Sequence, residues 1–183
     1  YDLVSKITRE CEMPFAYGGG LKDINVVKKI TRLGVEKISI NTALYKKNNF
    51  VNDCVKYLGS QSVMASIDLK KTIFGNYNAY SYSGKIKHNI NITSFIKNLE
   101  QKGVGEILLN FIDRDGKRNG SDLYFGNEIA KLINIPLIIC GGISSVNEIN
   151  KILSSNISAI AASSLFIFNK KKEVLINYPF TND

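Results

Sequence analysis

The 183-residue sequence predicts an α/β domain with a parallel sheet, and three observations lead to this prediction. Short apolar segments alternate along the chain with segments in which apolar residues recur at helical spacing. The apolar segments are of the kind that is buried on both faces, as the strands of a parallel sheet are. A unit made of a strand, a glycine pair, a helix and a second strand occurs twice, which indicates an architecture built from repeats.

The first elements are defined by apolar spacing and by the glycines that follow them. Ile24, Val27, Ile30 and Leu33 recur at helical spacing, and Gly34 ends that helix. In order, we expect a strand at 14–17, a helix at 24–33, a strand at 37–42, a helix at 50–58 and a strand at 63–68.

The stretch from 70 to 91 has a different character, because aromatic residues and glycines are interspersed there among polar residues. We expect a hairpin or a long loop at this place. The alternation then resumes with a helix at 93–102, a strand at 106–112, a helix at 122–133, a strand at 136–140, a helix at 146–153 and a strand at 159–163.

The repeat has an offset of 122 residues, at which Pro14 aligns with Pro136 and the pair Gly19-Gly20 aligns with Gly141-Gly142 without a gap. If the unit is half of a closed barrel, each half holds four strands, and a complete barrel needs about 250 residues. We therefore expect a single domain over 1–183 that contains strands three to eight of a (β/α)8 TIM barrel. The first two βα units would precede Tyr1.

Composition excludes several classes of protein. No run of 18 apolar residues exists, so no membrane span is expected. The net charge of +8 is scattered rather than arranged in a stripe, and no nucleic-acid-binding motif accompanies it, so nucleic acid is not an expected partner. Cys11, Cys54 and Cys140 are far apart, which argues against disulfides and a zinc site and favours a reducing cytoplasm. No metal and no cofactor is expected.

Polar groups follow the predicted strands, and in a barrel the carboxyl ends of the strands form one rim. Glycines there let backbone N–H groups approach an anion, and the helix that follows presents its positive end. We expect phosphate at both glycine pairs, on opposite sides of the rim, which would suit a substrate with a phosphate at each end. The two sets are Gly141 and Gly142 with Ser163 and Ser164, and Gly19 and Gly20 with Asn41 and Thr42.

Asp68 ends the third predicted strand, and a carboxylate at this position can act as a general acid or base. The alternative is a structural role, as a helix cap or in a salt bridge to Lys70 or Lys71. In the segment 113–116, Asp115 and Gly116 could cap a turn or orient the substrate, and Asp113 and Arg114 could form an ion pair. His88 lies in the predicted polar loop and is a poor catalytic candidate.

Together, several motifs resemble the HisF family, the cyclase subunit of imidazole glycerol phosphate synthase. They are YGGG at 17–20, KISINTA at 37–43, GSQSV at 59–63, ASID at 65–68, GEILL at 105–109, DRDG at 113–116 and AASSLF at 161–166, and the resemblance runs from Asp2 to Phe168.

The resemblance implies a (β/α)8 barrel of two similar halves. It also implies a heterodimer with a HisH-like glutaminase that supplies ammonia. The substrate would be a bis-phosphorylated formimino aminoimidazole carboxamide ribotide. The products would be imidazole glycerol phosphate and an aminoimidazole carboxamide ribotide, in histidine biosynthesis.

The resemblance also implies roles for individual residues. Asp68 matches one of two catalytic aspartates, and the other belongs to the first strand, ahead of Tyr1. Lys37 and Glu106 match charged residues of an ammonia gate at the bottom of the barrel. Phosphate-binding positions match Gly20, Asn41, Thr42, Gly142 and Ser164, and substrate-contacting positions match Asp115 and Gly116.

Five positions and the tail depart from the family's pattern. Asn110-Phe111 stands where small hydroxyl residues are usual, and Lys117, Cys140 and Ile167 replace Thr, Ser and His. With the segment 175–179, these departures resemble paralogues that accompany sugar amidation in surface-glycan biosynthesis. Two alternatives to a cyclase therefore stay open. One is an ammonia-conducting subunit for such amidation, and the other is an inactive barrel fragment or binding module.

Overall fold

The computed structural model describes residues 1–46 and 49–167. The end of the resemblance at Phe168 and the segment 175–179 lie outside the described residues. The elements in chain order are α1 (Asp2–Glu10), β1 (Ala16–Gly18), α2 (Ile24–Thr31), β2 (Lys37–Ile40), the 3-10 helix η1 (Thr42–Tyr45), α3 (Phe50–Leu58), the 3-10 helix η2 (Ser60–Ser62), β3 (Val63–Lys71), β4 (Tyr77–Ser81), β5 (Ile86–His88), α4 (Ile92–Gln101), β6 (Glu106–Phe111), α5 (Leu123–Ala130), β7 (Leu137–Cys140), α6 (Val146–Leu153), β8 (Ala159–Ala161) and α7 (Ser164–Ile167).

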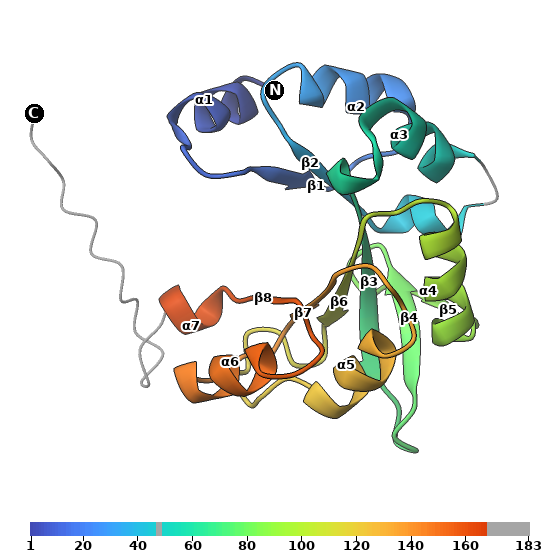
Figure 1. Ribbon diagram of the computed structural model, residues 1–183, viewed down its shortest axis with the longest axis vertical. Coiled ribbons are helices and arrows are strands. Elements are labelled where there is room, and N and C mark those ends of the chain that lie inside the picture. The colour runs from blue at the N-terminus through green and yellow to red at the C-terminus, as the bar shows by residue number, and fades with distance from the viewer. Residues whose placement is uncertain (47–48, 168–183) are drawn as a thin grey trace, which may run out of the picture.

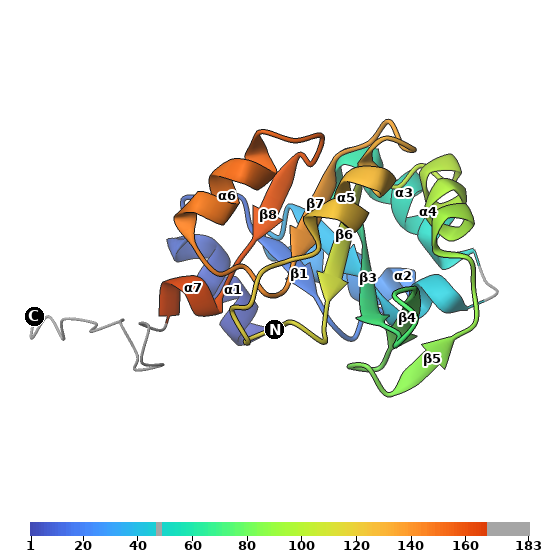
Figure 2. The same ribbon diagram turned by 90° about the horizontal axis from the view of Figure 1, so that it is seen from below.

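The main sheet is parallel, and its strands follow one another in the order β1-β2-β3-β6-β7-β8. The sheet curls so that β1 and β2 lie across from β7 and β8, and the helices lie on the outside of the curl (Figure 1). The view from below shows the same curl, with α6 and α5 outside β8, β7 and β6 (Figure 2). This arrangement confirms the predicted part of a (β/α)8 barrel.

The predicted repeat is present in the structure. Adding 122 to the bounds of α2 gives 146 and 153, which are the bounds of α6. Adding 122 to the bounds of η1 gives the bounds of α7. Both repeated helices begin in the same way, because Asp23 and Ser145 each accept a hydrogen bond from a backbone N–H of the first turn. The two units are therefore equivalent in local structure as well as in sequence.

Alternation along the strands separates a covered face from a concave face. Side chains that point toward the helices are fully buried, among them Ile67 on β3, Leu109 on β6 and Ile139 on β7. Their sequence neighbours point inward and are only half-buried, because successive side chains of a strand lie on opposite faces. Asp68, Asn110 and Cys140 are on this concave face, paired in register across β3, β6 and β7.

The segment 70–91 is the predicted hairpin. β4 pairs with the end of β3 in antiparallel fashion, from Asp68 opposite Tyr80 to Lys71 opposite Tyr77, and β5 pairs with β4. This pairing extends β3 to Lys71, beyond the predicted end at 68. The predicted helix at 122–133 is shorter and ends at Ala130.

Helix α1 was not predicted from the sequence, although Leu3, Val4 and Ile7 recur in it at helical spacing. None of its side chains is fully buried. It attaches to the neighbouring unit through Thr8, whose hydroxyl donates to the Leu33 carbonyl oxygen at 2.5 Å. Val4 packs against the core. These two contacts hold the amphipathic helix against the neighbouring unit.

Three further expectations concern cysteines, membranes and metals. Cys11, Cys54 and Cys140 are free, and Cys11 is half-buried just after α1. In the part of the chain that the structure describes, no helix has the length and apolar character needed to cross a bilayer. No group of three potential metal ligands occurs among the same residues.

Candidate functional site

A cavity of about 480 Å³ lies at the carboxyl ends of β1, β2 and β3. It brings together five of the predicted site residues, namely Gly19, Gly20, Asn41, Thr42 and Asp68. The rest of its lining consists of Leu21, Lys22, Ser39, Ala43, Lys46, Ser66, Tyr82 and Ser83. The predicted phosphate site of Gly19 and Gly20, which is called the first site below, therefore shares one cavity with the predicted catalytic carboxylate. Two lysines also line this cavity.

The glycine turn of this cavity is open. Gly19 and Gly20 have positive φ angles of 104° and 67°, and a Cβ added at either would meet no atom within 4 Å. The helix that follows does not offer its first N–H groups, because the Asp23 carboxylate accepts from Asn25 N and Val26 N at 2.9 and 3.1 Å. An anion here would depend on the backbone of the turn, on Thr42 and on the lysines, and less on the helix end that sequence reasoning invoked.

Asp68 is held by Asn110 and not by a lysine. The Asn110 side-chain amide donates from Nδ2 to Asp68 Oδ1 at 2.9 Å. Lys70 donates to the Gly84 carbonyl oxygen and Lys71 to Asp122, so both structural alternatives that paired Asp68 with these lysines are wrong. Because Asp68 belongs to β3, it caps no helix either.

Burial raises the pKa of Asp68 above its usual value. The hydrogen bond from Asn110 opposes this effect, and the nearby Asp115 carboxylate adds to it. A carboxylic acid with a raised pKa is better matched to proton transfer near neutral pH than an exposed one. The same environment places Asp115 close enough to influence Asp68, as expected if both face the substrate.

The second glycine pair has a different environment. A Cβ at Gly141 would come within 2.5 Å of the Phe111 carbonyl oxygen, and one at Gly142 within 2.5 Å of the Gly120 carbonyl oxygen. Gly120 also donates from its backbone N–H to the Gly142 carbonyl oxygen at 2.8 Å. Close backbone packing therefore already requires glycine here, and phosphate binding at Gly141 and Gly142 stays a prediction.

Ser163 is exposed and Ser164 half-buried, at the start of α7. The Ser163 carbonyl oxygen accepts from the N–H groups of Phe166 and Ile167, which closes the short helix. Both residues lie at the carboxyl end of β8, next to the end of β7, as predicted. Their contact with phosphate stays a prediction.

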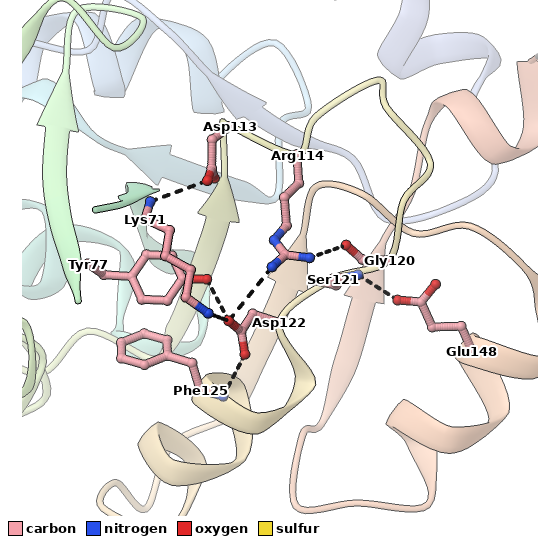
Figure 3. A network of polar contacts seen from close by, with 9 residues as sticks. All are labelled: Lys71, Tyr77, Asp113, Arg114, Gly120, Ser121, Asp122, Phe125 and Glu148. Carbon is pink, nitrogen blue, oxygen red and sulfur yellow. Dashed lines mark hydrogen bonds and ion pairs between the residues drawn. The ribbon is translucent and has the colours of Figure 1, made fainter. Parts of the chain in front are cut away.

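The loop after β6 is fixed by a network around Asp122, which sequence reasoning missed as a polar centre (Figure 3). Its carboxylate accepts from Lys71 Nζ at 2.7 Å, Tyr77 OH at 2.8 Å and the Phe125 backbone N–H at 3.0 Å. Arg114 Nη2 lies 3.9 Å away. Burial alone would raise the pKa of Asp122, but the hydrogen bonds from Lys71, Phe125 and Tyr77 outweigh it and lower that pKa.

The predicted ion pair between Asp113 and Arg114 is wrong. Asp113 accepts from the Lys71 backbone N–H at 3.3 Å, whereas Arg114 donates to the Gly120 carbonyl oxygen at 2.8 Å and faces Asp122 (Figure 3). Adjacent residues of this turn point to different sides, so each finds a partner farther along the chain. Asp115 and Gly116 lie between these anchored positions.

The far side of the same loop is tied to α6 by Glu148. Its carboxylate accepts from the Ser121 backbone N–H at 2.6 Å and from Ser144 N at 2.9 Å. Burial would raise the pKa of Glu148, but hydrogen bonds from Ser144 and Ser121 lower it. A negative charge therefore stands at the start of α6, close to the second predicted phosphate site.

Lys37 and Glu106 form an ion pair at the other end of the sheet. Lys37 Nζ lies 2.5 Å from Glu106 Oε1, and both side chains are largely shielded from solvent. They are the first residues of β2 and β6, and β3 lies between these strands. The pair is thus at the amino end of the barrel interior, opposite Asp68.

His88 lies on β5 and not in a loop, and its Nε2 is 2.7 Å from Ser81 Oγ. Its ring stacks on Tyr45 at a centroid distance of 3.8 Å, and Tyr45 stacks in turn on Phe95 at 5.2 Å. Burial lowers the pKa of His88. These contacts support the expectation that His88 is a poor catalytic candidate.

Comparison with known proteins gives a consistent result. The family described as histidine biosynthesis protein matches residues 1–172. Two relatives carry the name "Putative imidazole glycerol phosphate synthase subunit". The one called hisF2, from Pseudomonas aeruginosa, is 40% identical over 184 residues, covering 100% of this chain and 73% of the relative. The one called hisF3, from Vibrio vulnificus, is 37% identical over 182 residues, covering 98% and 70%. A relative from Alkaliphilus metalliredigens, "Imidazole glycerol phosphate synthase subunit HisF", is 34% identical over 170 residues, covering 92% and 68%.

Proposed function

The chain belongs to the HisF family of histidine biosynthesis proteins, and on this premise we propose that it acts as the cyclase subunit of an imidazole glycerol phosphate synthase. The substrate is the bis-phosphorylated formimino aminoimidazole carboxamide ribotide. The products are imidazole glycerol phosphate and aminoimidazole carboxamide ribotide. The observation that carries the proposal is the cavity in which Asp68 faces the turn of Gly19 and Gly20.

Asp68 serves as a general acid or base in this proposal. Ring closure requires protons to move between nitrogen and oxygen atoms of the substrate, and a carboxylic acid of raised pKa can both release and accept them near neutral pH. The second carboxylate, by resemblance, belongs to a strand ahead of Tyr1. We propose that two βα units there close the sheet between β8 and β1, which are the two ends of the parallel strand order among the described residues.

Phosphate binding orients the substrate across the rim. Lys22 and Lys46 line the cavity together with Thr42 and the open glycine turn, and this combination attracts an anion and gives it hydrogen-bond donors. The opposite phosphate would meet Gly142 and Ser164. Asp115 and Gly116, on the loop anchored by Asp122, would contact the substrate between the two phosphates.

Ammonia enters at the opposite end in this proposal. The ion pair of Lys37 and Glu106 gates that end, and the concave face leads from it past Met64 and Leu108 toward Asp68. A glutaminase of the HisH type would bind there and form a heterodimer. The support is the position of the pair at the amino end of the strands, together with the names of the HisF relatives.

The test is turnover of the complete chain with Asp68→Asn, measured with free ammonium and, separately, with glutamine plus the glutaminase. The isosteric amide keeps the size but cannot exchange the proton, so turnover should fall by roughly 10²–10⁴-fold in both assays. Asp53→Asn, at an exposed position of α3, is the matched control and should leave turnover unchanged. Undiminished cyclisation by Asp68→Asn would refute the role of this residue.

A second function is favoured by one observation, namely that Asn110 stands beside Asp68 and Cys140 beside Asn110. By resemblance, hydroxyl residues are usual at these two positions. This alternative is an ammonia-conducting subunit for sugar amidation. In that case the wild-type complete chain shows no cyclisation with ammonium, and Asp68→Asn leaves partner-dependent amidation unchanged.

A further inference from the structure

Asn110 lies on the concave face, and only one of the two polar atoms of its side-chain amide has a hydrogen-bond partner among the described residues. Its register partners are Asp68 on β3 and Cys140 on β7, so it stands in the same row as the proposed catalytic carboxylate. Nδ2 donates to Asp68 Oδ1 at 2.9 Å. Oδ1 of the same amide is buried and has no hydrogen-bond partner among the described residues.

A buried carbonyl oxygen without a partner costs about 1–3 kcal/mol. Most such groups in folded proteins are paired, and an exception is explained by strain or by a water, an ion or a ligand that completes the hydrogen bond. Because the donor side of the amide is engaged by Asp68, the orientation of Asn110 is determined and Oδ1 can only accept. The missing partner must therefore supply a hydrogen.

We propose that Asn110 positions Asp68 and, through Oδ1, binds an N–H group of the reactants. The N–H group comes either from the incoming ammonia or from a nitrogen of the bound phosphorylated substrate. This inference rests on the proposed function and deepens it, because it assigns a binding role to a residue at which the chain departs from its family.

The side chains of Asp68 and Asn110, which lie next to each other in register, favour a ligand that donates an N–H group. A carboxylate oxygen and an amide oxygen side by side form an acceptor pair, which attracts an amine or ammonium group and repels a carbonyl or phosphate oxygen. The charged and titratable groups that face Asp68 from neighbouring elements are Asp115, Tyr45 and Cys140, and Lys22 and Lys46 line the same cavity. The lysines lie with the glycine turn that is expected to hold phosphate, so phosphate and the N–H group have separate places.

An amide can do what a hydroxyl at this position does less well. A hydroxyl uses one oxygen both to donate to Asp68 and to accept from the substrate, and its hydrogen rotates freely. Asn110 separates the two tasks between two atoms of one rigid plane. The carboxylate and the substrate nitrogen can then be held at the same time.

The first measurement is the pKa of Asp68, followed by carboxyl ¹³C NMR in the complete protein. Asn110→Leu removes the donor at similar volume and should raise the Asp68 pKa, because this hydrogen bond favours the ionised form. Cys140→Ala changes the other register neighbour of Asn110 and is the matched control, for which no such rise is expected. An unchanged Asp68 pKa in Asn110→Leu would overturn the positioning role.

The second measurement follows the side-chain amide signal of Asn110 during titration. Ammonium chloride and the bis-phosphorylated substrate are the two arms, and tetramethylammonium chloride, a cation without N–H groups, is the control. A displacement by ammonium alone assigns the N–H group to ammonia, and one by the substrate alone assigns it to the substrate. No displacement in either arm would overturn the binding role.

Both measurements are independent of turnover. If the complete wild-type chain does not cyclise the substrate, the proposed cyclase activity fails, while the NMR results still decide the role of Asn110. If it does cyclise, Asn110→Leu should raise KM about 10-fold for the reactant identified by the titration and leave the other KM unchanged.

Discussion

The two glycine pairs of the repeat should respond differently to the same substitution. Gly19 and Gly141 are equivalent positions at an offset of 122 residues, and their φ angles are similar, at 104° and 94°. A Cβ at Gly19 meets no atom within 4 Å, whereas one at Gly141 would lie 2.5 Å from the Phe111 carbonyl oxygen. Gly19→Ala and Gly141→Ala therefore share the cost of backbone strain but differ in the cost of crowding.

The magnitudes follow from these two effects. An alanine in a backbone conformation that favours glycine costs about 1–3 kcal/mol, and this applies to both variants. Crowding against a backbone atom that cannot rotate away adds about 1–3 kcal/mol for Gly141→Ala only. We expect the free energy of unfolding to fall by about 1–3 kcal/mol more for Gly141→Ala than for Gly19→Ala.

Urea denaturation of the wild type and both variants measures this difference directly, from midpoints at a common slope. Equal destabilisation by the two substitutions would contradict the reasoning, because it would mean that the turn of Gly141 relaxes without cost. A greater loss for Gly19→Ala would show that the open cavity at the first pair is closed in solution.

Three further predictions follow from the polar groups. The pKa of Asp122 is lowered in the folded state, so its contribution to stability is present above its unfolded value of about 3.9 and is lost as the pH falls toward the folded value. Asp122→Asn should therefore lower the free energy of unfolding at pH 7 by about 1–3 kcal/mol and flatten its fall below about pH 5 in acid titrations. Thr42→Glu should weaken binding of a bis-phosphorylated ligand in calorimetry through charge repulsion, and Lys117→Ala should matter less; equal effects would contradict the first phosphate site. Lys37→Ala should lower glutamine-dependent turnover more than ammonium-dependent turnover in the complete complex, and equal losses would argue against a gate.

Much of the fold was predictable because local signals and tertiary structure agree. The alternation of apolar segments with helices marked by glycines identified all six strands of the parallel sheet and their order. The repeat predicted equivalent units, and α2 and α6 have equivalent bounds. Helix α1 was missed although Leu3, Val4 and Ile7 recur in it at helical spacing. Its attachment through Thr8 and Leu33 is a contact that no local pattern encodes.

The candidate site was predictable where polar residues stand at or near the end of a parallel strand pairing, as with Asp68, Asn41 and Thr42, since these ends converge on one rim. The network around Asp122 was not, because its partners Lys71 and Tyr77 come from a hairpin far away in the sequence. Gly141 and Gly142 matched a phosphate motif, yet the same motif also satisfies a demand for close packing. The requirement for close packing becomes visible only when the backbone atoms next to Gly141 and Gly142 are known.

Register is what turns Asn110 into a neighbour of Asp68. Side chains alternate along a strand, so a slip of one residue between β3 and β6 would place Leu109 or Phe111 opposite Asp68 and turn Asn110 toward the helices. Nothing in the sequence of either strand alone states this alignment. It is set by the burial of Ile67 and Leu109 under the outer helices, since their loss from the core would cost several kcal/mol. The apolar face of the sheet therefore determines which polar group meets the proposed catalytic carboxylate on the other face.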